Sequence, residues 1–188
     1  IEDQSKTITQ GFKKSGHCIG LIGFSMEELG GSEYLKVLFD KNEGKPPVLD
    51  RKQEKHVQKF CLELIHKELI QSAHDCSEGG LVIAVAESCF SSPEETLGAT
   101  IEFESTLRGD ALMFSESQSR IVISFPEELK NQIENLALSY SIDFSVIGKT
   151  GGSQFTVNIN SQEYIKQDIE TIKEIWKTSL GRYVGQTT

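Results

Sequence analysis

The chain has 188 residues, 37% of them hydrophobic, which is enough for one sizeable core, or at most for one domain with a smaller attachment. No apolar run approaches the ~20 residues that span a bilayer, and the chain starts without the basic and apolar stretches of a signal peptide, so we expect a soluble, cytoplasmic protein without a membrane partner. The formal net charge of −9 argues against a nucleic-acid partner, which needs clustered Lys and Arg.

The first fifty residues predict a linker, a strand and a short amphipathic segment. Residues 1–10 are polar and show no pattern of helix or strand, so we expect a remnant of a preceding domain or a linker, with one domain over 11–188. The apolar run 17–24 between glycines is typical of a buried strand. Gly30 and Gly31 then precede an amphipathic segment from Ser32 to about Phe39.

The middle of the chain carries the most regular pattern and the most contradictory one. Asp50 can cap a helix of about twenty residues, whose apolar side chains recur at helical spacing. Residues 73–81, AHDCSEGGL, precede an apolar helix expected over about 79–91. Asp75 and Glu78 have the spacing of a capping box. The two glycines after them weaken the first turn by roughly 0.5 to 1 kcal/mol each, so the box and the glycines conflict.

The second half predicts strands and helices in alternation. The expected elements are a strand at 97–104, a short helix at 109–116, a buried strand at 119–125, a helix from Pro126 to about Tyr140, a hairpin of 144–150 with 154–160, and a last helix at 169–184 that turns Ile172, Ile175, Trp176 and Leu180 inward. No regular βαβ rhythm appears, so these elements indicate an α+β fold, a mixed sheet with packed helices.

Three polar or glycine-bearing stretches could carry chemistry: LGGSE at 29–33, HDCSEGG at 74–80 and FSESQSR at 114–120. None is a P-loop or a dinucleotide fingerprint. Gly79 and Gly80 could let helix-start amides approach a phosphate, or let another backbone pack there, and both alternatives stay open. Glu116 and Gln118 could reach hydroxyl or amide groups of a ligand, and Arg120 could hold Glu116 or a phosphate, whereas a plain polar strand edge is the alternative.

Histidine and cysteine residues offer little further chemistry. His74 could act as a general base near pH 7, but the sequence shows no partner for it, so a hydrogen-bonded, half-buried histidine is favoured. The 4 cysteines include no C-x-x-C pair, which favours buried reduced thiols over a zinc or redox site. We therefore assign no catalytic residue and no metal ligand within this chain.

The motifs taken together resemble one family. LGGSEYLKV followed by GKPPVLD, QSAHDCSEGGLVIAVAES, MFSESQSR and VIGKT is similar in order to the second-half C-terminal domain of phosphoribosylformylglycinamidine (FGAM) synthases, over about residues 11–150. This resemblance implies the three-layer α/β/α fold of the AIR synthase-related C-terminal domain. Sister enzymes of the AIR synthase superfamily share a domain with an Asp and glycines before a helix, but not this combination of motifs.

The resemblance also implies an activity. FGAM synthases are ATP- and magnesium-dependent ligases that use ammonia from glutamine to convert formylglycinamide ribonucleotide (FGAR) to its amidine in purine biosynthesis. The family's main ATP and magnesium ligands lie in the amino-terminal domains, so the fragment alone is expected to be inactive. The alternatives are a docking platform for a glutaminase partner and a domain of a sister enzyme.

Site residues follow from the resemblance by motif only. Glu116, Ser117 and Gln118 are the look-alikes of the Glu-Ser-Gln that binds the phosphoribosyl substrate in the family's first half. The glycines of the other two stretches, Gly30, Gly31, Gly79 and Gly80, are carried over as candidate substrate- or nucleotide-binding positions. The preceding domains of the same chain, and a glutaminase subunit, are the implied protein partners.

Overall fold

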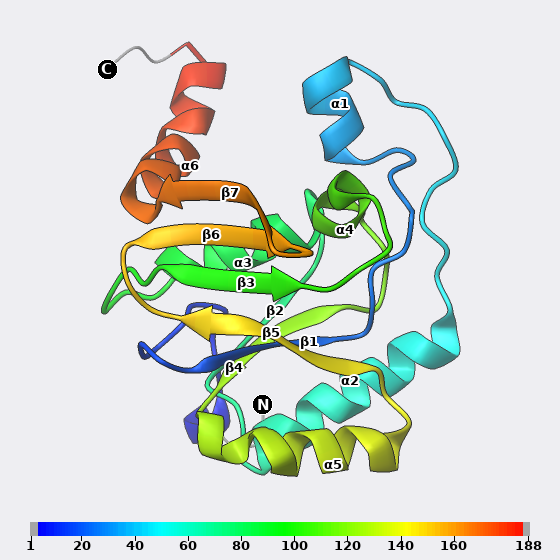
Figure 1. The fold of residues 1–188 in the computed structure, drawn as a ribbon, viewed down its shortest axis with the longest axis vertical. Helices are drawn as coiled ribbons and strands as arrows, with labels where there is room; N and C mark the ends of the chain where they lie inside the picture. The colour runs from blue at the N-terminus through cyan, green and yellow to red at the C-terminus, as the bar shows by residue number, and fades with distance from the viewer. Residues whose placement is uncertain (1–3, 186–188) are drawn as a thin grey trace.

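A computed structural model describes residues 4–185 of the chain (Figure 1). Seven strands form one mixed sheet in the order β2-β4-β1-β5-β3-β6-β7, and all neighbours are antiparallel except β3 and β6. The strands are β1 (Cys18–Ile22), β2 (Ser72–Asp75), β3 (Ala99–Phe103), β4 (Ile121–Phe125), β5 (Phe144–Thr150), β6 (Gln154–Ile159) and β7 (Gln162–Asp168). The helices are α1 (Glu33–Phe39), α2 (Arg51–His66), α3 (Gly80–Phe90), α4 (Gly109–Phe114), α5 (Lys130–Tyr140) and α6 (Ile169–Tyr183), with 3-10 turns η1 (Gln4–Lys6) and η2 (Glu127–Leu129).

Helices cover both faces of the sheet, and each face has its own core. Alternate residues of β1 and β4 point to opposite sides because side chains alternate along a strand. Ile19 and Val122 join the core under α3 and α4, whereas Ile22 and Ile123 join the core under α2 and α5. This arrangement confirms the predicted α+β fold with a helix layer on each side of a mixed sheet. Within residues 4–185, none of the helices has the length and apolar character needed to cross a membrane.

Two helix starts follow the local sequence signals closely. The Asp50 carboxylate accepts hydrogen bonds from the amides of Lys52 and Gln53, at 2.8 and 3.2 Å, so it caps α2 as predicted. Ser32 caps α1 in the same way, by accepting from the amide of Leu35 at 3.4 Å. Gly31, at φ +73°, makes the turn before that cap.

The predicted hairpin between β5 and β6 is wrong, because β3 lies between these two strands. The loop that joins them turns around the start of β3, where Gly98 donates to the carbonyl of Gly152 at 2.8 Å and Gly151 donates back to Gly98 at 2.7 Å. The hairpin partner of β6 is β7, through Asn160 and Ser161 at φ +50° and +63°, as a two-residue hairpin turn requires. This polar edge strand has no fully buried residue, so hydrophobic pattern did not reveal it.

The predicted capping box before α3 is also wrong. Asp75 is the last residue of β2, where it pairs with Ile121 of β4, and it lies outside the cap of α3, which begins at Gly80. Its carboxylate accepts instead from the hydroxyl of Ser77, at 2.5 Å. The cap position belongs to Gly79, at φ +78° and without a side-chain hydrogen bond.

The inner face predicted for the last helix is mostly wrong. Ile172 packs against the core, but Ile175, Trp176 and Leu180 are 55%, 53% and 71% exposed. The reason is that α6 leaves the sheet beyond its edge strand β7, so its outer turns extend past the sheet (Figure 1). The helix itself runs where the periodicity places it, at Ile169–Tyr183.

The cysteines are free and buried, as predicted. Burial raises the pKa of the Cys61 and Cys76 thiols to about 11, and also raises that of Cys89. Because the thiolate is the reactive form, a thiol of pKa 11 should react at pH 8 about two orders of magnitude more slowly than an unperturbed one. We therefore expect Ellman's reagent to label the thiols of the native chain slowly. In the urea-unfolded chain it should label all four thiols rapidly. Rapid labelling of Cys76 in the native chain, read by mass spectrometry, would contradict this.

Candidate functional site

The carboxylate of Glu116 joins the three stretches singled out in the sequence. Its Oε1 accepts a hydrogen bond from the amide of Glu33, the first residue of α1, at 2.9 Å. The same oxygen accepts from the amide of Gly79, the residue that caps α3, also at 2.9 Å. Two helix N-termini therefore point at one oxygen, and the partial positive charge of each favours the carboxylate there. The position that an external anion would take at these amides is filled by a side chain of the protein.

Glu116→Ala should lower the free energy of unfolding by about 2–3 kcal/mol, because hydrogen bonds to a charged group contribute about 1.5–3 kcal/mol each and these two share one acceptor. Glu116→Gln keeps an acceptor oxygen and should cost less than half as much. Urea unfolding followed by circular dichroism measures both. The matched control is Glu102→Ala on the exposed side of β3, which should stay within about 0.5 kcal/mol. A loss for Glu116→Ala as small as for the control would refute the role of this carboxylate.

The neighbours of Glu116 point in different directions. Ser117 is fully buried, and its Oγ accepts from the amide of Met26 at 3.1 Å, so it holds the segment after β1. Gln118 is exposed, and its Nε2 donates to the carbonyl of Glu116 at 3.1 Å. Ser117 therefore fastens the backbone, whereas the side chain of Gln118 is exposed to solvent.

Arg120 does not hold Glu116, so that prediction is wrong. Its side chain is only 2% exposed and donates to the carbonyls of Ser115 at 2.6 Å and Ser117 at 2.8 Å, and to the hydroxyl of Ser25 at 2.7 Å. Burial lowers the pKa of the Arg120 guanidinium. The ordinary pKa of an arginine side chain is so high that the group nevertheless stays charged. The charged guanidinium thus binds groups of the protein itself, and it fixes the backbone of residues 115–117.

The glycines of the site lie against backbone or in turns. A Cβ on Gly80 would meet the carbonyl oxygen of Ser115 and lie 2.8 Å from the carbonyl carbon of Phe114. A Cβ on Gly30 would likewise meet the backbone of Lys45, whereas nothing lies within 4 Å of a Cβ on Gly31. The amide of Gly80 donates to the carbonyl of Ser77 at 3.1 Å, so the amides of both Gly79 and Gly80 are engaged within the protein.

A polar cavity of about 510 Å³ lies beside Glu116, between α2 and the ends of β2 and β4. Four carboxylates line it, together with hydroxyl and amide groups and with Arg120, whose guanidinium donates to Ser25, Ser115 and Ser117; the other polar lining residues include Glu54, Asp75, Ser77, Glu78, Glu116, Gln118 and Ser119. Carboxylates repel phosphate and accept hydrogen bonds from hydroxyl and amide groups, so the cavity suits the neutral part of a polar ligand. Within residues 4–185 no three or more His, Cys, Asp and Glu side chains are placed together as the ligands of a metal ion.

His74 is a hydrogen-bonded, half-buried histidine, as the sequence favoured. Its Nε2 lies 2.9 Å from Oε2 of Glu87 on α3. The other oxygen of Glu87 accepts from the indole of Trp176 at 3.1 Å. This chain of contacts fixes α3 against β2 and α6.

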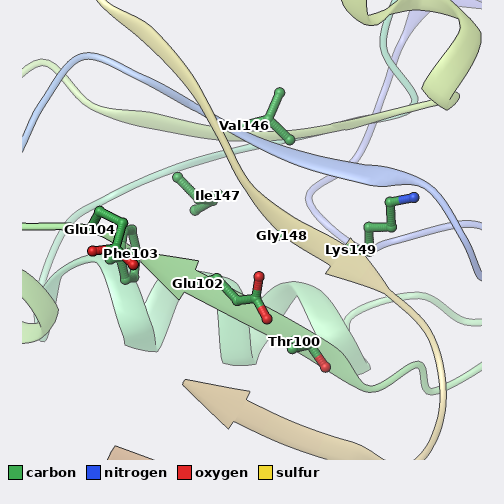
Figure 2. Close-up of a pocket in the computed structure, with 8 residues that line it drawn as sticks. All are labelled: Thr100, Glu102, Phe103, Glu104, Val146, Ile147, Gly148 and Lys149. Atoms are coloured by element: carbon green, nitrogen blue, oxygen red, sulfur yellow. The ribbon is translucent and has the colours of Figure 1, made fainter. Parts of the chain in front are cut away.

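A second hollow, of about 560 Å³, lies over β3 and β5 (Figure 2). It is on the same face of the sheet as α2 and α5, over the part that these helices do not cover. Figure 2 shows Thr100 and Glu102 of β3 beside Gly148 and Lys149 of β5. The Nζ of Lys149 pairs with Glu127 at 2.8 Å. None of the residues that line this hollow belongs to the three stretches, so it lies apart from the predicted site.

Comparison with known proteins identifies the same C-terminal domain that the sequence motifs resemble. The family described as AIR synthase related protein, C-terminal domain, matches residues 14–160. The phosphoribosylformylglycinamidine synthase subunit PurL of Alkaliphilus metalliredigens (strain QYMF) is 41% identical over 181 residues, which cover 96% of this chain and 24% of that protein. The chain therefore spans about a quarter of the length of this curated relative.

Solved structures share the fold at low identity. The structure of T. maritima PurL complexed with FGAR has a TM-score of 0.77 at 18% identity, and the match covers 90% of this chain and 30% of that chain. The thiamine-monophosphate kinase from Stenotrophomonas maltophilia K279a has a TM-score of 0.53 at 15% identity, over 85% of this chain and 54% of that one. The chain belongs to the family of AIR synthase related proteins and forms their C-terminal domain.

Proposed function

We propose that this chain is the C-terminal domain of an FGAM synthase, the ATP-dependent ligase that converts FGAR and glutamine-derived ammonia to formylglycinamidine ribonucleotide. The observation that carries the proposal is the 41% identity to a PurL subunit over 96% of the chain, which includes all three stretches that meet at Glu116.

The domain supplies structure and part of a binding surface, and the chemical step belongs to other parts of the synthase. The helix-start amides beside Glu116 are engaged internally, and within residues 4–185 no three His, Cys, Asp or Glu side chains gather as metal ligands. ATP and Mg²⁺, which activate the amide oxygen of the substrate, would therefore be held by the preceding domains. A cytoplasmic location and ammonia supply by a glutaminase subunit complete the proposal, with residues 1–10, which lie partly outside the described residues, as a remnant of a preceding domain or a linker.

The site residues divide into positioning residues and one candidate ligand contact. Glu116 and Ser117 hold the segments before α1 and α3, and the glycines 30, 31, 79 and 80 allow backbones to approach or turn there. Gln118 is exposed at the acidic cavity, where its amide can bond a ribose hydroxyl or the substrate's amide group. The phosphate of the substrate would lie away from these carboxylates, against another part of the synthase.

The proposal is tested with a fusion enzyme in which this chain replaces the matching quarter of Alkaliphilus metalliredigens PurL. With ATP, Mg²⁺, FGAR and ammonium, the fusion enzyme should form the amidine product, and the 188-residue chain alone should form none. Product formation by the chain alone would refute the division of labour proposed here. A folded fusion enzyme without activity would refute the assignment to FGAM synthase.

Gln118→Ala in the fusion enzyme should raise the KM for FGAR about two- to twelvefold with kcat nearly unchanged, because one hydrogen bond contributes about 0.5–1.5 kcal/mol and a contact made equally in ground and transition states affects binding alone. The matched control is Gln154→Ala on β6, an exposed glutamine away from the cavity, which should leave both constants unchanged. Identical kinetics for the two variants would remove Gln118 from the binding surface.

A further inference from the structure

The bend at residues 116–120, directly before β4, holds one residue in an unfavourable backbone conformation. Ser119 has φ +62°, in the left-handed region that residues with a Cβ rarely adopt. The same residue lines the polar cavity beside Glu116. Strained residues persist only where neighbouring contacts fix them, and they cluster at functional sites. The contacts that fix Ser119 therefore indicate which residues shape the cavity.

The end of β1 and the side chain of Arg120 constrain the backbone of this bend. A Cβ on Gly23 would meet the carbonyl oxygen of Ser119, so the two backbones lie in direct contact there. Nε of Arg120 donates to the carbonyl of Ser117 at 2.8 Å. Both contacts act on the backbone, and neither binds the side chain of Ser119.

The side chain of Ser119 is bound by Glu54 of α2. Oε2 of Glu54 accepts from the hydroxyl of Ser119 at 2.7 Å, across 65 residues of the chain. The other carboxylate oxygen accepts from Nε2 of Gln58, one turn further along α2, at 2.6 Å. Asp50 caps this helix, so Glu54 stands on a rigid element. Because a hydrogen bond to a charged acceptor is stronger than one between neutral groups, Glu54 is well suited to keep Ser119 in its strained conformation.

The bend carries Gln118, the candidate ligand contact. Gln118 directly precedes Ser119, and its side chain is exposed where it lines the cavity. Its Nε2 donates to the carbonyl of Glu116 at 3.1 Å, and among residues 4–185 none donates a hydrogen bond to its amide oxygen. A group that is fixed before binding loses less conformational entropy when it meets a ligand. The hold of Glu54 on Ser119 thus bears directly on the affinity that Gln118 can provide.

We infer that Glu54 is a positioning residue of the proposed FGAR-binding surface. Through Ser119 it holds the 116–120 bend so that the side-chain amide of Gln118 meets a hydroxyl or amide group of the substrate. Both carboxylate oxygens of Glu54 accept hydrogen bonds from the protein itself, so Glu54 acts on the substrate through Ser119 and not by contact. This inference rests on the proposed function, because the substrate it names is the one proposed above.

Hydrogen exchange of the 188-residue chain, measured by mass spectrometry, tests whether Glu54 holds the bend. Glu54→Ala should speed the exchange of amides in 116–120 by about fivefold or more and leave those of α5 unchanged. The matched control is Glu63→Ala, because Glu63 is on the same helix, pairs with Lys67 at 3.3 Å and does not line the cavity. Equal exchange of the bend in the two variants would overturn the inference.

Steady-state kinetics of the fusion enzyme test whether the held bend serves the substrate. Glu54→Ala should raise the KM for FGAR about two- to twelvefold, no more than Gln118→Ala does, with kcat nearly unchanged. In the Gln118→Ala background it should have no further effect, because the contact that it positions is already lost. Two variants should keep the KM within about twofold of the unmodified fusion enzyme: Glu54→Gln, which retains an acceptor oxygen, and Glu54→Ala with Ser119→Gly, since glycine adopts the left-handed conformation freely.

These results separate the inference from the proposed function. An active fusion enzyme whose KM is the same with Glu54→Ala as with Glu63→Ala would overturn the positioning role and leave the function standing. Additive effects of Glu54→Ala and Gln118→Ala on KM would also overturn it, because Glu54 would then act independently of Gln118. A folded, unmodified fusion enzyme without activity would overturn the proposed function and, with it, this inference.

Discussion

Gly80→Ala should lower the free energy of unfolding by about 2–5 kcal/mol. Gly80 lies at φ +73°, a left-handed conformation that costs a residue with a Cβ roughly 1–2 kcal/mol. The new methyl group would also meet the carbonyl oxygen of Ser115 and the backbone of Phe114, and overpacking of this kind typically costs 1–3 kcal/mol. Equilibrium unfolding in urea, followed by circular dichroism, measures the loss.

Gly152→Ala is the matched control for this prediction. Gly152 has nearly the same backbone conformation, φ +69°, but nothing lies within 4 Å of an added Cβ. The control should lose only the conformational part, about 1–2 kcal/mol. The difference between the two variants therefore measures the approach of the α3 backbone to Ser115, and equal losses would mean that Gly80 serves only its turn.

Arg120→Met should be the second large effect, with a loss of about 3–5 kcal/mol in the free energy of unfolding. The guanidinium donates to the carbonyls of Ser115 and Ser117 and to the hydroxyl of Ser25, and each partner left unpaired in the interior costs about 1–3 kcal/mol. Met fills a similar volume, so the loss reports the hydrogen bonds more than a cavity.

Arg108→Met controls for the loss of an arginine as such. Its side chain is 66% exposed and pairs with Asp110 at the surface, so the change should stay within about 1 kcal/mol. A loss for Arg120→Met no larger than for Arg108→Met would show that the buried guanidinium does not hold the 115–117 segment.

Local signals in the sequence predicted the elements whose structure is determined locally. Asp50, followed by apolar residues at helical spacing, places α2 correctly because capping and amphipathic packing act within a few residues. Strand pairing is different, since it depends on residues far apart in the chain. The two runs around Gly151 and Gly152 look like a hairpin, yet β3 lies between them, and only the tertiary structure decides that.

In the candidate site, too, local patterns predicted some features, whereas contacts between residues far apart in the chain appeared only in the tertiary structure. Sequence motifs singled out the three stretches, but Glu116 meets Glu33 and Gly79 across 83 and 37 residues, so their convergence was not visible in any local pattern. Arg120 was recognised as important for the wrong contact, because its burial depends on the packing of the loop after β1. The apolar stripe of α6 packs only in part within this domain, because Ile172 lies against the core and Trp176 contacts Phe90, whereas Ile175 and Leu180 are exposed.

Initial rates of FGAR-dependent ADP formation with ammonium as the nitrogen donor test the central claim, that this chain is an FGAM synthase domain, most directly. The fusion enzyme is compared with a second fusion that carries the corresponding domain of the Stenotrophomonas maltophilia kinase, which shares the fold with a TM-score of 0.53. We expect activity in the first fusion and none in the second. Equal rates, or a folded first fusion without FGAR-dependent turnover, would contradict the assignment.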